Sequence, residues 1–134
     1  LARRPPGQGG YVGTRVYRLL VGLTVQMGDV LQNNGRSGLS AGGGLMPAEG
    51  YRIKHTVPGI VSMVRGAGGN VDSRFFITTR PGDSGYLDAP GRGYVAFGRV
   101  LEGLNVLTDM DQVGSRTGDS QPNIAIEIKA CGIL

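Results

Sequence analysis

The chain has 134 residues, 40% of them apolar, and carries a formal net charge of +4 with a pI near 9.6. This length allows one domain with a hydrophobic core, and no apolar run approaches the roughly 20 residues of a membrane-spanning helix. The basic residues are mostly arginines, scattered along the chain without a basic run or interleaved aromatic residues. We therefore expect a solvated, mildly basic surface and no specific nucleic-acid partner.

Glycine and cysteine contents narrow the class further. The 25 glycines predict many tight turns, which favours an all-β domain over a helical bundle. The single cysteine, Cys131, excludes an internal disulfide and fits a reducing compartment or indifference to redox state. We therefore expect an intracellular protein, of the cytosol or of an organelle such as the mitochondrion. Cys131 is expected to lie in an alternating terminal strand, so its thiol is expected to be buried.

The chain begins with an irregular segment that precedes a series of short strands. Residues 1–10 are rich in Arg, Pro and Gly and are expected to form a linker or arm, with residues 11–134 as one domain. Runs of apolar and β-branched residues predict about six strands. In chain order these strands are 15–23, 23–25, 58–63, 75–79, 95–100 and 124–128.

Turns and one helix connect the predicted strands. The Asn-Asn-Gly and Ala-Gly-Gly-Gly sequences at 33–35 and 41–44 predict turns, and residues 81–93 predict a long surface loop. Apolar residues recur at helical spacing within 102–113, which predicts a helix that stops at Gly114. The spaced apolar residues are Leu104, Leu107 and Met110.

The most informative segments are 57–63, Val-Pro-Gly-Ile-Val-Ser-Met, and 73–77, Ser-Arg-Phe-Phe-Ile. They resemble the cyclophilin signature, in which G-P-G-x-L-S-M-A-N leads to N-G-S-Q-F-F-I. Further blocks agree with this family in order and spacing, and together they extend the resemblance from Gly10 over nearly the whole chain. These blocks are 16–20, 25–29, 86–88, 94–100 and 102–107.

The resemblance implies an all-β fold: a cyclophilin-like antiparallel β-barrel with one retained flanking helix. Members of the family are closed eight-stranded barrels with two helices. Gly10 and Tyr11 match a point about a third of the way into that domain, so the first two strands and the first helix are expected to be lacking. Open strand edges are unfavourable in water. We therefore expect an upstream segment, another protein chain or a rearranged terminus to cover them.

The resemblance also implies a site for proline isomerisation. Rotation about an X-Pro bond must cross a barrier of about 18–20 kcal/mol that amide resonance creates. In the family, an arginine donates toward the proline nitrogen, and this arginine corresponds to Arg18. Gln26 corresponds to the residue that steadies the arginine, and Phe76 and Leu87 correspond to residues of the proline pocket. No nucleophile, metal or cofactor is expected, and proline-containing protein segments are the expected ligands.

Other positions of the implied site depart from the family. Leu23 keeps the pocket floor apolar, whereas Thr24 makes it less so. Val64 replaces a small alanine and is expected to narrow the groove. Arg65 replaces an asparagine whose backbone holds the peptide.

Three further departures lie downstream. Arg74 replaces a glutamine that positions substrate and is expected to crowd Arg18 with like charge. Tyr86 replaces the tryptophan associated with cyclosporin binding, so binding of that drug is not expected. Tyr94 replaces a histidine at the pocket rim. The expected substrate-binding set is Gln26, Leu23, Val64, Arg65, Arg74, Phe76, Tyr86, Leu87 and Tyr94.

Two other motifs have simpler interpretations. Residues 82–85, Gly-Asp-Ser-Gly, match the nucleophile motif of some serine proteases, but such a serine needs a base and an orienting acid. The only histidine is His55, in a Lys-His-Thr sequence that also resembles the cyclophilin family and predicts a structural role. Arg18 and Gln26 also have an ordinary alternative as a paired arginine and a polar strand residue.

Three functions therefore remain open from the sequence. The first is a peptidyl-prolyl isomerase with attenuated or lost activity, which the retained Arg18 favours. The second is a structural cyclophilin-like subunit of a large, for example organellar, assembly. The substituted cleft and the lacking strands favour this second role, toward which the sequence leans. The third is a module that binds X-Pro segments without isomerising them.

Overall fold

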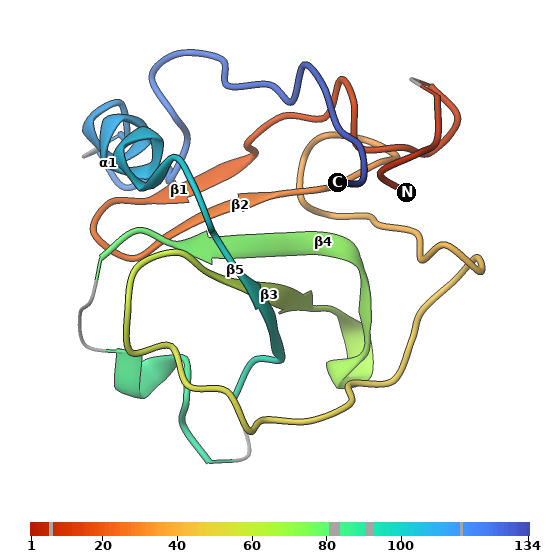
Figure 1. The fold of residues 1–134 in the computed structure, drawn as a ribbon, viewed down its shortest axis with the longest axis horizontal. Coiled ribbons are helices and arrows are strands. Elements are labelled where there is room, and N and C mark those ends of the chain that lie inside the picture. Colours follow the sequence, from red (N-terminus) through yellow and green to blue (C-terminus); the bar gives the residue numbers. More distant parts are fainter. Residues whose placement is uncertain (6, 81–83, 91–92, 116) are drawn as a thin grey trace.

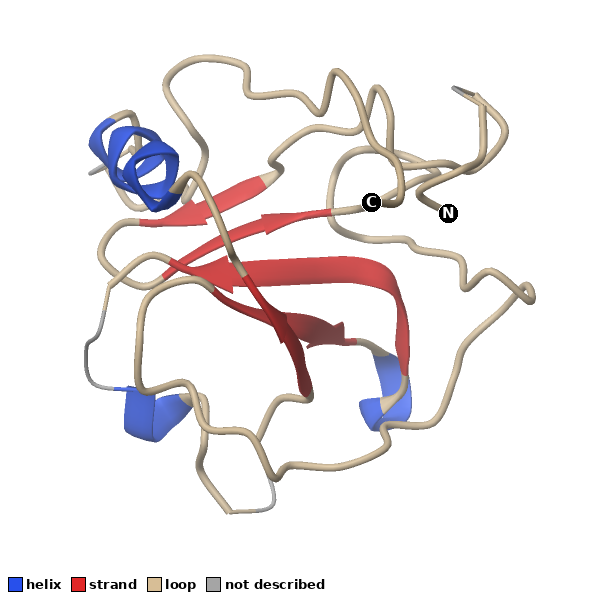
Figure 2. Ribbon diagram, viewed as in Figure 1, coloured by secondary structure: helices blue, strands red, loops and turns tan. Residues whose placement is uncertain are grey.

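The computed structural model describes residues 1–5, 7–80, 84–90, 93–115 and 117–134. Its centre is one antiparallel sheet of five strands in the order β1-β2-β4-β3-β5 (Figure 1). The strands are β1 (Arg18–Leu20), β2 (Thr24–Met27), β3 (Ile60–Arg65), β4 (Val71–Thr78) and β5 (Ala96–Arg99). One α-helix, α1 (Leu104–Gln112), and two 3-10 turns, Ala67–Gly69 and Ser84–Tyr86, complete the regular structure, and loops form most of the rest (Figure 2).

This mainly antiparallel architecture with one α-helix confirms the predicted fold class. In the described residues the sheet has two ends, β1 and β5, which do not pair with each other. Closure into a barrel therefore stays a prediction. No helix in the described part of the chain is long and apolar enough to cross a membrane.

The hydrophobic core lies on one face of the sheet. Leu19 is the register partner of Val25, and Val25 is the partner of Ile77. Residues that are directly opposite on neighbouring strands point to the same face, and Leu19 and Val25 are fully buried. The core cluster consists of Val16, Leu19, Val25 and Met27, with Phe75, Ile77, Met110, Ile126 and Ile128 packed against it.

Helix α1 is attached to the sheet by a buried carboxylate. Asp111 Oδ1 accepts hydrogen bonds from the Gly22 backbone N–H at 2.8 Å and from Thr79 Oγ1 at 3.3 Å. Arg80 Nε lies 3.3 Å from the other oxygen of Asp111. One side chain therefore connects the helix, the β1–β2 turn and the end of β4.

The extent and buried face of α1 are close to the prediction. The helix is shorter than 102–113 and ends before Gly114, where a Cβ would lie 2.4 Å from Val21 Cγ2. Of the three spaced apolar residues, Leu107 is buried and Met110 packs against the core, but Leu104 is 46% exposed. The helical periodicity therefore identified the element, although its first apolar residue faces solvent.

The prediction of a sixth strand at 124–128 is wrong. This segment runs antiparallel beside residues 13–16, where Val16 N–H donates to Ile126 O and Ile128 N–H to Thr14 O, both at 2.9 Å. The regular contact is limited to one isolated bridge between Arg15 and Glu127. Farther along, Leu19 N–H bonds to Ser120 O instead. The ladder therefore does not continue along β1, and a single bridge is too short to form a strand.

The prediction of a buried thiol at Cys131 is also wrong, because residues 129–134 form no regular element and are exposed. Strand boundaries differ as well. The first strand is limited to Arg18–Leu20, and β4 begins at Val71 rather than 75. The turn at 33–35 is confirmed by positive φ angles of 56° at Asn33 and 78° at Gly35. Residues 81–83 and 91–92 of the predicted surface loop, including two residues of the Gly-Asp-Ser-Gly motif, lie outside the described residues.

Candidate active site

A row of side chains crosses the sheet on the face opposite the core. Arg18 is the register partner of Gln26, Gln26 of Phe76, and Phe76 of Ser62. Because direct partners share a face, β1, β2, β4 and β3 contribute one side chain each to a continuous row. Pairing of these strands therefore brings together three of the predicted site residues, which are up to 58 positions apart in the chain.

Two neighbouring cavities lie over this row. The smaller cavity has a volume of about 130 Å³ and is lined by nine of the ten predicted site residues. Its lining consists of Arg18, Leu20, Leu23, Thr24, Gln26, Val64, Arg65, Phe76, Tyr86, Leu87 and Tyr94. This size suits one small ring rather than a large ligand, since pockets for drug-sized molecules begin at about 300 Å³.

The larger cavity, of about 490 Å³, continues from the smaller one. The two share Arg18, Gln26, Val64 and Arg65 as a common wall. The tenth predicted residue, Arg74, lines only the larger cavity. The remaining lining is Tyr17, Asn34, Gly35, Asp119, Ser120 and Gln121. An extended peptide can therefore contact both cavities at once.

His55 packs against Phe76, which forms the floor of the smaller cavity. Its ring stacks on Phe76 with centroids 5.7 Å apart, and Nδ1 lies 2.7 Å from Asp88 Oδ1. The His55 backbone N–H donates to the other oxygen of Asp88 at 3.0 Å. Burial alone would raise the pKa of Asp88, but the hydrogen bonds from His55 outweigh it and lower that pKa. His55 therefore has the predicted structural role, and it fixes the segment that carries Leu87.

Two tyrosines form the rim of the smaller cavity. Tyr94 packs edge-on against Phe76 with centroids 5.3 Å apart, and its hydroxyl lies 3.3 Å from that of Tyr86. Burial, followed by the hydrogen bond with Tyr86, raises the pKa of Tyr94 to about 12. The Tyr94 hydroxyl is therefore protonated at neutral pH. Tyr86 is 63% exposed, so it borders the cavity without closing it.

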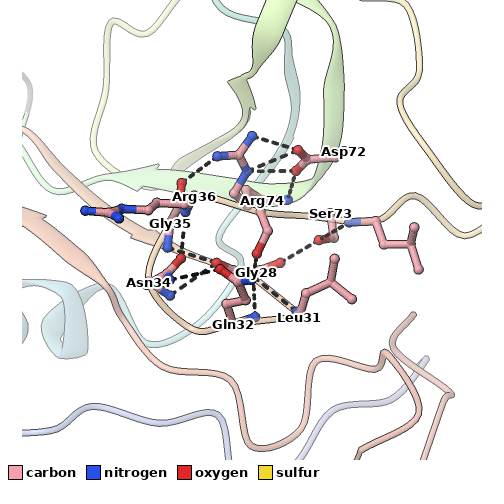
Figure 3. A network of polar contacts seen from close by, with 12 residues as sticks. Gly28, Leu31, Gln32, Asn34, Gly35, Arg36, Asp72, Ser73 and Arg74 are labelled. Carbon is pink, nitrogen blue, oxygen red and sulfur yellow. Dashed lines mark hydrogen bonds and ion pairs between the residues drawn. The ribbon is translucent and has the colours of Figure 1, made fainter.

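Arg74 is paired within the fold, as Figure 3 shows. Its Nε donates to both carboxylate oxygens of Asp72, at 3.0 and 3.1 Å, and its Nη2 donates to Oδ2 at 2.7 Å. Its Nη1 donates to the Gly35 carbonyl. Arg74 is only 9% exposed and its charge is compensated by Asp72, so the expected crowding of Arg18 by a free like charge is not observed. A contact between Arg74 and substrate stays a prediction.

A buried aspartate shapes the loop that forms one wall of the larger cavity. Asp29 is fully buried, and its carboxylate accepts hydrogen bonds from four backbone N–H groups and one hydroxyl. The donors are Leu31 at 3.1 Å, Gln32 at 2.9 Å, Asn34 at 3.1 Å, Gly35 at 2.9 Å and the Ser37 hydroxyl at 3.0 Å. Burial would raise the pKa of Asp29, but these hydrogen bonds outweigh it and hold the pKa below its usual value. The loop is therefore ordered around one ionised group.

Sequence reasoning missed several residues of the larger cavity. The Asn-Asn-Gly sequence predicted a turn but gave no sign that Asn34 reaches the cleft. Ser120 and Gln121 lie at the larger cavity because the Ser120 carbonyl oxygen accepts a hydrogen bond from the Leu19 backbone N–H at 2.7 Å. This contact joins segments about 100 residues apart, and no sequence pattern marks it.

Comparisons with known proteins show the family to which the chain belongs. A family model described as cyclophilin type peptidyl-prolyl cis-trans isomerase matches residues 6–133. A peptidyl-prolyl cis-trans isomerase of Encephalitozoon cuniculi (strain GB-M1) is 38% identical over 134 residues, which is 100% of this chain and 74% of that protein. Both matches extend over the strands and loops that line the two cavities. The chain therefore belongs to the cyclophilin-type peptidyl-prolyl cis-trans isomerase family.

Proposed function

We propose that this chain is a peptidyl-prolyl isomerase of attenuated activity, with Arg18 as its catalytic residue. The observation that carries the proposal is the position of Arg18, in register with Gln26 and on the lining of a small cavity whose floor is Phe76. Membership of the family implies proline-containing peptides as substrates.

The proposed chemistry needs only binding and one cation. The proline ring enters the smaller cavity against Phe76 and Leu87, both of which are buried apolar side chains. The Arg18 guanidinium then donates to the proline nitrogen as that nitrogen becomes pyramidal. The lone pair of the proline nitrogen then no longer conjugates with the carbonyl group, and the barrier to rotation about the X-Pro bond is lower. Gln26, directly opposite on β2, positions the guanidinium.

The wall between the cavities supports the attenuated rate. Val64 and Arg65 both line the passage that the peptide backbone must occupy. A branched side chain is stiff at χ1 and cannot move aside easily, so Val64 restricts how closely the backbone approaches Arg18. The expected result is catalysis that is measurable but slow.

Exchange NMR on an Ala-Pro peptide tests the proposal. Arg18→Ala is expected to reduce the catalysed exchange by about 100- to 1,000-fold, as removal of one transition-state donor does. Arg99→Ala is the matched control, since Arg99 is exposed on β5 and absent from the lining of both cavities. The protein's amide spectrum verifies folding in the same sample. Exchange that is unaffected by Arg18→Ala would reject Arg18 as the catalytic group.

A second candidate, a structural subunit of a larger assembly, is favoured by β5. This strand ends the sheet in the described residues, and Phe97 and the following Leu101 are 56% and 72% exposed. Exposed apolar residues on an edge strand, such as Phe97, and just after it, such as Leu101, are typical of a surface that another protein covers. A folded protein that binds no X-Pro peptide and accelerates no exchange would favour this role. Binding without acceleration would favour a module that holds X-Pro segments.

A further inference from the structure

Two arginines of the cleft differ from the others around them. Arg18 and Arg65 line both cavities. In the described part of the chain, neither guanidinium lies within 4.0 Å of a carboxylate, whereas Arg74 and Arg80 are paired with Asp72 and Asp111. Arg65 donates to the Gly93 carbonyl at a distance of 3.5 Å, which is a weak contact.

The two guanidinium groups converge from opposite sides of the cleft. Arg18 is on β1 and Arg65 on β3, and β2 and β4 lie between them. Three strand spacings separate these backbones by about 14 Å, yet both side chains reach the same 130 Å³ cavity. Both positive charges also lower the pKa of the Tyr94 hydroxyl, whereas burial raises that pKa. A ligand in the cleft therefore lies between two positive charges.

The neighbouring acidic groups do not cancel this charge. Asp72 compensates Arg74, and among the described residues Asp119 is the only acidic residue that lines the larger cavity. Asp119 is exposed and accepts from the Gln121 backbone N–H at 3.1 Å. One exposed carboxylate faces two arginines without ion-pair partners in the described residues, so the cleft has an excess of positive charge.

We propose that this cleft selects X-Pro segments that carry an anionic side chain, either a carboxylate or a phosphate, two residues before the proline or directly after it. The inference rests on the proposed function of the same cleft. Arg18 is committed to the proline nitrogen, so Arg65 binds the anion with its planar set of donors, which matches carboxylate and phosphate oxygens. The common wall allows both contacts because the anionic residue occupies the larger cavity while the proline occupies the smaller one.

Matched peptides test the preference. Each contains one Ala-Pro bond, with Gln, Glu, phosphoserine or Lys two residues before the proline in one series and directly after it in another. Exchange NMR gives the catalysed rate for each peptide relative to its uncatalysed rate. Glu or phosphoserine is expected to exceed Gln by about five- to tenfold in one series, and Lys to fall below it. The ratio should decrease in 1 M NaCl because partly exposed charges are screened.

Arg65→Gln is the decisive variant, and Arg99→Gln is its control because it removes one exposed charge outside the cleft. Arg65→Gln is expected to bring the Glu-to-Gln ratio close to one, whereas Arg99→Gln should leave it unchanged. An equal decrease of the Glu-to-Gln ratio in both variants would overturn the inference, since the net charge of the protein would then explain the preference. A preference for phosphoserine alone would identify phosphate as the selected anion, and a preference for both would identify any anion.

Failure of the inference can be distinguished from failure of the proposed function. Equal acceleration of all the peptides would overturn the preference and leave the isomerase intact. If no peptide is accelerated, the isomerase proposal fails, and titration of the same peptides against amide shifts decides the preference. The preference would then be supported if the Glu or phosphoserine peptide binds more tightly than the Gln peptide and Arg65→Gln abolishes that difference. Equal affinities for all the peptides would overturn the preference.

Discussion

Asp72 and Arg74 lie two residues apart on β4 and form an ion pair inside the fold, with side-chain exposures of 1% and 11%. The pair also holds the loop at Gly35, because the Arg74 guanidinium donates to that carbonyl. Charged residues such as these are usually found on the surface, but both belong to the interior of this fold. β4 begins four residues earlier than its apolar pattern indicates because Val71, its first residue, is the register partner of Arg65 on β3.

Removal of Arg74 is expected to be costly. Arg74→Gln leaves the Asp72 carboxylate buried without its cation, which should lower the free energy of unfolding by about 3–5 kcal/mol. Urea denaturation measures this loss. The double variant Asp72→Asn with Arg74→Gln should lose less than the two single variants together, because it leaves no unpaired charge. Additive losses would show that the pair does not act as a unit.

Asp29 is expected to make stability depend on acid pH. Its pKa is below the usual 3.8 in the folded protein. The stabilisation is therefore present above the unfolded-state value and is lost as pH falls through the lower, folded value. Thermal unfolding between pH 6 and pH 2 should show this decline. Asp29→Asn should be less stable at pH 6, by about 1–3 kcal/mol, and should decline less steeply. The exposed Glu102→Gln should leave the steepness unchanged.

Val64→Ala is expected to widen the cleft. Val64 lines both cavities and is half-buried, so its truncation relieves crowding of the bound peptide at a small cost in stability, about 1 kcal/mol. We expect kcat/KM on an Ala-Pro peptide to increase by about threefold to tenfold. Exchange NMR at several substrate concentrations separates kcat from KM. An unchanged or lower value would show that Val64 does not limit the reaction.

Gly59 is expected to resist substitution. Its φ is +83°, and a Cβ there would lie 2.7 Å from Leu104 Cδ2 and 3.3 Å from Val100 Cβ. Gly59→Ala should therefore lower the unfolding free energy by about 1–3 kcal/mol through backbone strain and crowding at the start of α1. Gly42→Ala is the matched control, because a Cβ at that position meets no atom within 4 Å. Similar effects at both positions would contradict this account.

Cys131 is expected to react readily with a thiol reagent in the native state. Its side chain is exposed, and the segment that carries it, residues 129–134, is irregular and exposed. The rate of reaction with dithionitrobenzoate in buffer should approach the rate in denaturant, since access to the thiol does not require unfolding. Strong protection in buffer would indicate that another surface covers this segment.

The sequence predicted which residues lie together in the cleft better than it predicted the strand boundaries. Arg18, Gln26 and Phe76 were identified because they belong to motifs with a fixed local pattern, and nine of the ten predicted residues line the smaller cavity. Arg74 was read as a free charge because the carboxylate that pairs with it could not be known from spacing. The strand at 124–128 was wrong because alternation indicates which side chains can be buried, but not how far a neighbouring ladder continues.

The order of the strands has a consequence for folding. The β1–β2 and β3–β4 hairpins each form between neighbouring segments, whereas β2 and β4 pair only after the long connection from residue 28 to residue 59 has closed. Such distant pairings form late and slowly. Arg18 and Gln26 belong to the first hairpin, and Val64 and Phe76 belong to the second. An intermediate with both hairpins formed but not docked would therefore contain most of the sheet's local structure and none of the cleft, so ligand binding would report the last step of assembly.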